Sequence, residues 1–240
     1  MASLQSLAAR VGGLSNPSKM PGYSWSIPAT RCQLGAILAQ QPGSTCHGCY
    51  ALKGSYSWRS TKNAMERRYA ALMAALETPE TRARWVADWV AILEHRERRT
   101  LRNLERGKPI GRDDGRFFRW HDSGDIQSVA HLAVLADIAR AVPGVRFWLP
   151  TREAGMVKRF LAGNTLPDNL RVRLSTPRID QPTPAGFESL RRMAPGLAVS
   201  GVHTGNPLTG FEACSAPERA GHCGDCRACW GADAVSYKKH

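Results

Sequence analysis

Short apolar strands alternate with amphipathic helices through the second half of the sequence. The expected strands are 116–120, 145–150, 169–175 and 197–202, and the expected helices between them are 128–142, 151–163 and 184–194. Such short connections imply right-handed βαβ units and therefore a parallel sheet. With an earlier strand within residues 24–32, four to six units are too few for a complete eight-stranded barrel. We therefore expect an α/β fold, built as a partial barrel or an open parallel sheet.

Length and composition restrict the class of protein further. The chain has 240 residues, of which 42% are hydrophobic, so it can bury a full core in one domain, with or without a small appendage. No run approaches the roughly 18 apolar residues of a membrane span, and the N-terminus lacks the pattern of a signal peptide. These features predict a cytoplasmic protein without a membrane partner.

The seven cysteines lie in two separate groups. Cys32, Cys46 and Cys49 form the N-terminal cysteine group, and Cys214, Cys223, Cys226 and Cys229 form the C-terminal cysteine group. Cysteines used for packing would be scattered through the core, and an odd number leaves one thiol outside any disulfide framework. In a cytosolic chain, clustered cysteines indicate metal binding more often than disulfides.

The C-terminal cysteine group has the spacing C-x8-C-x2-C-x2-C. Three cysteines within seven residues resemble the compact ligand runs of ferredoxins and favour a 4Fe-4S cluster. Zinc is the alternative, because four thiolates also satisfy a tetrahedral structural site.

The N-terminal cysteine group has three cysteines and no obvious fourth ligand. A four-iron cluster held by three thiolates keeps one iron open, which is the arrangement that allows S-adenosylmethionine to bind and be cleaved. Tyr50, directly after Cys49, is an aromatic residue typical of such sites. Alternatively, His47 is a fourth ligand, the site holds zinc, or these cysteines share one site with the C-terminal group. One or two clusters are therefore expected.

Polar residues follow each expected strand of the sheet. Because the carboxyl ends of parallel strands meet at one edge, we expect these side chains to converge there. They are His121, Asp122, Asp125, Arg152, Glu153, Ser175, Thr176, Arg178 and His203. If the protein is an enzyme, Asp125, His121, Arg152 and Glu153 are the candidate catalytic residues. For any single residue, a capping or surface role is the alternative, and Ser128 is the expected N-cap of its helix. The phosphate-loop and dinucleotide-binding fingerprints are absent.

Several segments carry a resemblance to a known family. SNPSKMPGYSWSIPATRC, CHGCYALKGSY, FRWHDSGDIQSVAHL, FWLPTRE and CGDCRACW resemble the phage gene-product-88 family nearly end to end. More distantly, the cysteine loop followed by an aromatic strand and a Gly-Asp loop is similar to radical-SAM-like iron–sulfur proteins, although thirteen residues separate Cys32 from Cys46 where three are usual.

The radical-SAM-like resemblance implies a (βα)6-like partial barrel over residues 1–212 and a cluster-binding tail over 213–240. It makes Cys32, Cys46 and Cys49 the ligands of the cluster that binds S-adenosylmethionine, with Gly124, Asp125 and Tyr50 as further cofactor-binding residues. It makes the C-terminal cysteine group the ligands of an auxiliary cluster.

The net charge of +13 is the remaining clue to a partner. Arginine supplies most of the positive charge, with its densest run at 96–119. This run is either a solvated helix face or a footprint for nucleic acid, with Trp58 or Trp25 stacking on bases. Three functions remain open: a radical-SAM-like enzyme acting on a nucleic acid or nucleotide, a non-enzymatic cluster protein that binds nucleic acid or a host partner, and a structural zinc protein.

Overall fold

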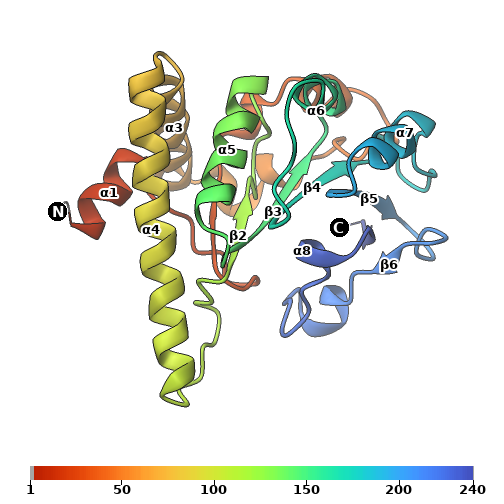
Figure 1. Cartoon of the computed structure of the whole chain (residues 1–240). Helices are drawn as coiled ribbons and strands as arrows, with labels where there is room; N and C mark the ends of the chain where they lie inside the picture. Colours follow the sequence, from red (N-terminus) through yellow and green to blue (C-terminus); the bar gives the residue numbers. More distant parts are fainter. Residues whose placement is uncertain (1–2, 240) are drawn as a thin grey trace.

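The computed structural model describes residues 3–239 and has an α/β fold around one open, seven-stranded parallel sheet (Figure 1). The strand order is β1-β2-β3-β4-β5-β7-β6, and every pairing is parallel. The strands are β1 (Tyr23–Trp25), β2 (Phe117–Trp120), β3 (Arg146–Thr151), β4 (Leu170–Ser175), β5 (Leu197–His203), β6 (Glu212–Ala213) and β7 (Ala234–Lys238). The predicted α/β class and parallel sheet are confirmed, and the sheet does not close into a barrel.

The helices connect successive strands, as the alternation predicts. They are α1 (Leu4–Arg10), α2 (Leu34–Ala39), α3 (Arg59–Ala75), α4 (Pro79–Glu105), α5 (Val129–Ala141), α6 (Ala154–Leu161), α7 (Ala185–Met193) and α8 (Ala228–Gly231), with short 3-10 helices η1 (Ala29–Arg31), η2 (Tyr50–Leu52), η3 (Gly54–Ser57) and η4 (Ala216–Arg219). The start of α4 is fixed by a capping box between Thr78 and Thr81. Ser128 caps α5 by accepting a hydrogen bond from the His131 amide.

The two faces of the sheet bury different sets of side chains. Alternate strand residues such as Phe118, Trp120 and Phe147 enter the main core, to which α3, α4, α5, α6 and α7 contribute apolar residues. Trp25 lies in this core without solvent exposure and packs edge-on against Trp89. The prediction that Trp25 stacks on nucleic acid is therefore wrong, because no face of its ring is accessible.

The opposite face of the sheet is covered by the C-terminal segment. The Trp230 side chain on α8 donates a hydrogen bond to the Phe118 carbonyl on β2, at 2.9 Å, and packs against Trp148 on β3. Figure 1 shows α8 on one side of the sheet and α5 and α6 on the other. Strand β7, which the sequence pattern did not predict, pairs with β5 and β6. The predicted division of the chain into an α/β domain over 1–212 and a cluster-binding tail over 213–240 stays a prediction.

All seven cysteines are free thiols. Among residues 3–239, no helix has the length and apolar character needed to cross a membrane.

Candidate metal centre with two cysteine groups

The N-terminal cysteine group lies in the long connection that follows β1. Cys32 ends η1, and Cys46 and Cys49 belong to a tight turn closed by a hydrogen bond from the Cys49 amide to the Cys46 carbonyl. Gly35, in α2, separates two of the sulfurs: a Cβ atom added there would lie 3.6 Å from the Cys32 Sγ and 3.7 Å from the Cys46 Sγ. Both sulfurs therefore lie within van der Waals reach of the same side of Gly35.

The pKa of the Cys32 thiol shows which polar groups lie near it. Burial raises the pKa of the Cys32 thiol well above its usual range, and the nearby Asp125, Cys46, Cys49 and Glu153 raise it further. As a free thiol Cys32 is therefore protonated at neutral pH, and a bound metal would have to displace that proton.

Arg152 connects the end of β3 to the cysteine loop. Its Nε donates a hydrogen bond to the Cys46 Sγ at 2.8 Å, and its Nη1 donates to the Thr176 carbonyl after β4. Burial raises the pKa of the Cys46 thiol, while the adjacent Arg152 lowers it. Arg152 therefore favours the thiolate of Cys46, which is the form that binds a metal.

Asp125 orients this arginine from the loop after β2. Its carboxylate accepts hydrogen bonds from the Arg152 amide at 2.8 Å, the Thr151 hydroxyl at 2.6 Å and the Ile126 amide at 2.7 Å. Burial raises the pKa of Asp125 to about 6, although the three hydrogen bonds lower it. Through Asp125 and Arg152, the ends of β2, β3 and β4 thus all connect to the cysteine loop that follows β1.

Two further carboxylates anchor the cysteine loop. Glu153 accepts a hydrogen bond from the Leu34 amide, at 2.8 Å, and so positions the start of α2. Asp122 accepts from the Tyr56 hydroxyl at 3.0 Å, and its carbonyl accepts from the Tyr50 hydroxyl at 2.6 Å. These contacts tie both sides of the cysteine loop to the strand ends.

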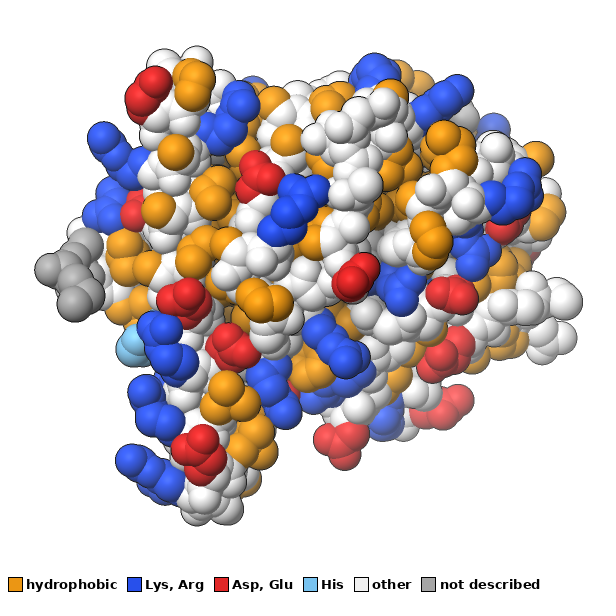
Figure 2. Space-filling view, in the orientation of Figure 1, with side chains coloured by type: hydrophobic (Ala, Val, Ile, Leu, Met, Phe, Trp, Pro, Cys, Tyr) orange, Lys and Arg blue, Asp and Glu red, His pale blue; other side chains and the backbone are white. Residues whose placement is uncertain are grey.

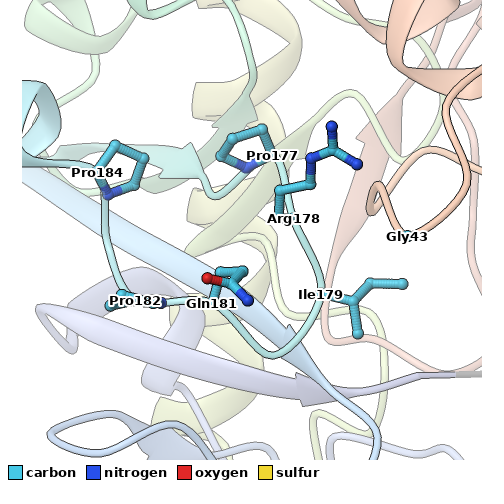
Figure 3. A pocket seen from close by; sticks show the side chains of 7 residues that line it. All are labelled: Gly43, Pro177, Arg178, Ile179, Gln181, Pro182 and Pro184. Atoms are coloured by element: carbon cyan, nitrogen blue, oxygen red, sulfur yellow. The ribbon is translucent and has the colours of Figure 1, made fainter.

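The same loop is also fastened to the segment after β4. The Thr45 amide donates to the Pro177 carbonyl, and the Ile179 amide donates to the Gly43 carbonyl. A surface pocket of about 500 Å³ lies at this junction (Figure 3). Its lining comprises Gly43, Pro177, Arg178, Ile179, Gln181, Pro182 and Pro184. Arg178 donates to the Pro42 carbonyl, so this predicted site residue holds the cysteine loop in place.

The structure places several other predicted site residues away from the cysteines. His121 is buried between Trp25 and His131 in the main core, and its backbone has a φ of 60°. A Cβ atom on Gly124 would lie 2.3 Å from the Ile27 side chain, so Gly124 allows the β2 loop to close on the β1 connection. His203 pairs with the Ser236 hydroxyl between β5 and β7.

Of three smaller candidates, Ser175 and His47 have polar partners for their side chains, and Thr176 has none. The Ser175 hydroxyl accepts a hydrogen bond from the Ser200 hydroxyl on the neighbouring strand. His47 is exposed, and its ring nitrogen lies 3.1 Å from the Ala39 carbonyl. The hydroxyl of Thr176 is buried without a hydrogen-bond partner among the described residues.

Cys229 of the C-terminal cysteine group lies in α8, and Cys214, Cys223 and Cys226 precede this helix in the chain. Burial raises the pKa of Cys223, and Cys214 and Cys226 raise it further. Burial raises the pKa of Cys229 to about 11; Tyr237 and Arg173 lower this value, and Cys214 raises it. The influence of Cys214 on both thiols places the four cysteines in one neighbourhood. Among residues 3–239, no group of three or more His, Cys, Asp or Glu side chains is arranged so that it could hold a metal ion.

Comparison with known proteins identifies the lineage of the chain. A family model described as gene product 88 matches residues 5–232. The chain belongs to this family. No curated protein and no solved structure matches the chain. The comparisons do not extend the relation to radical-SAM-like proteins.

Two arginines on the sheet face that carries the C-terminal cysteine group were not predicted from the sequence of this gene product 88 family member. Arg173 on β4 has no solvent exposure, and it donates to the carbonyls of Val199, Ala228, Cys229 and Ala232. Arg119 on β2 is partly buried, with its Nε shielded from solvent. The signal that could have found them is the alternation along each strand. Each arginine is flanked by two core residues, and neighbouring residues of a strand point to opposite faces of the sheet.

Four of the nine Lys and Arg residues in the basic run at 96–119 form ion pairs with nearby acidic residues. Asp113 pairs with Arg96 and Arg99, Asp114 pairs with Arg116, and Arg98 pairs with Glu94. Figure 2 shows Lys and Arg side chains along α4 interspersed with Asp and Glu. This arrangement favours a solvated helix face for the run.

Proposed function

We propose that this gene product 88 protein is an iron–sulfur protein with one open three-cysteine site and one closed four-cysteine site. One observation carries the proposal: three arginines near the cysteines have no carboxylate within ion-pairing distance among residues 3–239. Arg152 donates a hydrogen bond to the Cys46 Sγ and Arg173 donates to the Cys229 carbonyl, while the charge of Arg119 lowers the pKa of Cys223 and Cys229. Buried positive charge is costly unless a negative charge compensates it.

Free thiols cannot supply that negative charge. Burial raises the pKa of Cys32, Cys223 and Cys229, so these thiols are neutral near pH 7. A metal–thiolate centre deprotonates its cysteines and carries net negative charge, which would compensate the adjacent arginines. The buried Nε atoms of Arg119 and Arg173, which lack partners among the described residues, agree with such an anion.

The open site would be held by Cys32, Cys46 and Cys49. When bound there, an iron–sulfur cluster with an open iron supplies one-electron reduction of S-adenosylmethionine. The chain itself contributes positioning: Arg152 hydrogen-bonds Cys46, Asp125 fixes the Arg152 backbone, and Glu153 holds the start of α2. The serial order of β1 to β5 and the cysteine loop after β1 support a radical-SAM-like enzyme. The free cysteines support a reducing compartment, and we propose the host cytoplasm.

The closed site would be held by Cys214, Cys223, Cys226 and Cys229. Four thiolates also suit zinc, and a structural zinc site would compensate Arg173 equally well. For the whole chain, the alternative to a radical-SAM-like enzyme is an iron–sulfur protein without enzymatic activity. Colour and elemental composition separate iron–sulfur clusters from zinc.

The test of enzymatic activity is reductive cleavage of S-adenosylmethionine by anaerobically purified, reduced protein. We expect 5′-deoxyadenosine from the wild type, none from Cys46→Ser, and a product from Cys226→Ser if that protein retains iron at its N-terminal group. A wild-type protein that holds iron and sulfide but forms no 5′-deoxyadenosine would contradict the enzymatic proposal and leave the non-enzymatic cluster protein.

A second candidate function, binding of single-stranded nucleic acid, is favoured by the surface of the cysteine loop. Trp58 is 64% exposed and Tyr50 is 52% exposed. Lys53, Arg59 and Lys62 are exposed on the same segment. Aromatic rings interleaved with basic side chains are typical of surfaces on which bases stack.

Fluorescence titration with a single-stranded oligonucleotide tests this second candidate. We expect Trp58→Ala to weaken binding by about 1–3 kcal/mol, the matched exposed change Leu101→Ala to leave it unchanged, and the wild-type affinity to fall steeply with salt. An affinity that is insensitive to salt or to Trp58→Ala would exclude this surface as the binding site.

A further inference from the structure

The surface pocket beside the cysteine loop lies just beyond the carboxyl end of β4. Open α/β sheets hold ligands in the crevices outside the carboxyl ends of their strands. The volume of this pocket, about 500 Å³, falls within the range of ~300–1,000 Å³ that is common for small-molecule sites. Most of its lining comes from residues 177–184, and Gly43 completes it. Figure 3 shows the Arg178 guanidinium on the Gly43 side and the rings of Pro182 and Pro184 on the other.

The backbone around this pocket is held on two sides. On one side, the Ile179 amide donates a hydrogen bond to the Gly43 carbonyl at 3.1 Å. On the other side, the Asp180 amide donates to the Val202 carbonyl at 2.9 Å, and the Asp180 carboxylate accepts from the amide and the hydroxyl of Thr204. Three of the lining residues are prolines, whose rings fix their own φ angles. The pocket is therefore formed before a ligand arrives, which lowers the entropic cost of binding.

Arg178 is the one charged residue among those that line the pocket. Its Nη1 donates to the Pro42 carbonyl at 3.0 Å and its Nη2 to the Gln41 side-chain oxygen at 3.3 Å, and a guanidinium carries further N–H donors beyond these. Within residues 3–239, no carboxylate lies at ion-pairing distance from Arg178. The pocket thus offers an oriented positive charge to an anion, and a guanidinium suits phosphate.

The rest of the lining is apolar except for one amide side chain. The apolar residues are Pro177, Ile179, Pro182 and Pro184. Their rigid rings suit the face of a flat ligand. Gln181 is exposed, and its side chain forms no hydrogen bond within the described part of the chain. A glutamine amide offers both a donor and an acceptor, which is the combination that pairs with the edge of a nucleobase.

We propose that this pocket binds a nucleotide, with its base against the proline rings, the Gln181 amide on the base edge and the Arg178 guanidinium on the phosphate. A free nucleotide and an unpaired nucleotide of a single strand offer the same chemistry. Inorganic phosphate alone would use Arg178 and leave the prolines and Gln181 without a role. The inference goes beyond the proposed function, because it requires no metal at either cysteine group.

The test is isothermal titration calorimetry of the full chain with the common ribonucleoside monophosphates, their nucleosides and inorganic phosphate. We expect a monophosphate to bind more tightly than its nucleoside or phosphate. Gln181→Ala should weaken its binding about tenfold, and Arg178→Met about 10–100-fold, with partial recovery in Arg178→Lys. The matched controls are Gln5→Ala on α1 and Arg192→Met on α7, which remove an exposed amide and an exposed charge elsewhere and should leave the affinity unchanged.

Titration with a single-stranded oligonucleotide separates the two sources of the nucleotide. If the pocket holds a base of a strand, Gln181→Ala weakens oligonucleotide binding too, whereas a site for free nucleotides changes only the monophosphate affinity. If Arg178→Met fails to fold, Gln181→Ala decides, because the Gln181 side chain is exposed.

Three results overturn the proposal: no binding of monophosphates or oligonucleotide by the wild type, no effect of Gln181→Ala on either affinity, or inorganic phosphate binding as tightly as every monophosphate. Oligonucleotide binding that responds to Trp58→Ala and not to Gln181→Ala overturns the pocket and leaves the second candidate function standing.

Discussion

Single side chains at the strand ends determine how the N-terminal cysteine group is held. Arg152 reaches Cys46, Asp125 fixes Arg152, and Glu153 fixes the start of α2. Their place after β2 and β3 made them predictable, because the ends of parallel strands meet at one edge. Arg119 and Arg173 were not predicted, since a strand pattern does not reveal which element covers the second face. Tyr56 was missed because its partner, Asp122, is distant in sequence.

Removal of the Arg152 side chain should weaken metal binding at the N-terminal group alone. Partners that hydrogen-bond metal ligands typically contribute about 10–100-fold in metal affinity, and we expect a loss of this size in Arg152→Met. Iron retention against a chelator measures the loss, with the exposed Arg159→Met on α6 as the control. Equal retention in the two variants would show that Arg152 does not support the site.

Gly124 should tolerate no side chain. A Cβ there would lie 2.3 Å from Ile27, and the φ of Gly124 is 85°. We therefore expect Gly124→Ala to lower the free energy of unfolding by about 2–4 kcal/mol, measured by chemical denaturation of the metal-free protein. Gly163→Ala, where a Cβ meets open space, should change it by less than about 0.5 kcal/mol. Similar values for both variants would contradict the packing described for the β2 loop.

At the scale of elements, the strands from β2 to β5 and the helices between them were predictable, because apolar periodicity and caps such as Ser128 mark them directly. Strand β7 was not, since its five residues carry too little periodicity and follow a segment dominated by cysteine spacing. The packing of α5 on β1 was also unpredictable from pattern, and it buries His131 against Trp25.

Acid should loosen this contact between α5 and the sheet. Burial lowers the pKa of His131 to about 3 from its ordinary value of 6.5, so the stability present above pH 6.5 is lost as the pH falls toward 3. His121 acts in the same direction. Asp125 opposes it, because its raised pKa of about 6 favours the folded state on protonation.

The His131→Gln variant isolates this histidine. Between pH 7 and pH 4.5, we expect the metal-free wild type to lose about 2 kcal/mol more unfolding free energy than His131→Gln does. Denaturant titrations at the two pH values measure the difference. Parallel losses in the two proteins would mean that His131 is not buried in its neutral form.

At the scale of the whole molecule, the two faces of the open sheet are covered by different kinds of residues. One face packs a tryptophan-rich apolar core under the long helices, and the other carries the buried Arg173, the partly buried Arg119 and the C-terminal cysteine group. The cysteine loop after β1 connects the strand ends to that second face through Tyr50 and Arg119. We therefore propose metal–thiolate centres as the compensation for the unpaired positive charge on this face.

The number of iron and acid-labile sulfide atoms per chain, counted after anaerobic purification, tests this central claim most directly. Two four-iron centres predict about eight of each, with a brown protein. About four of each would indicate one shared centre, and zinc in place of iron would indicate a structural site. Either result, or a protein with no metal, would contradict the account of two iron–sulfur centres.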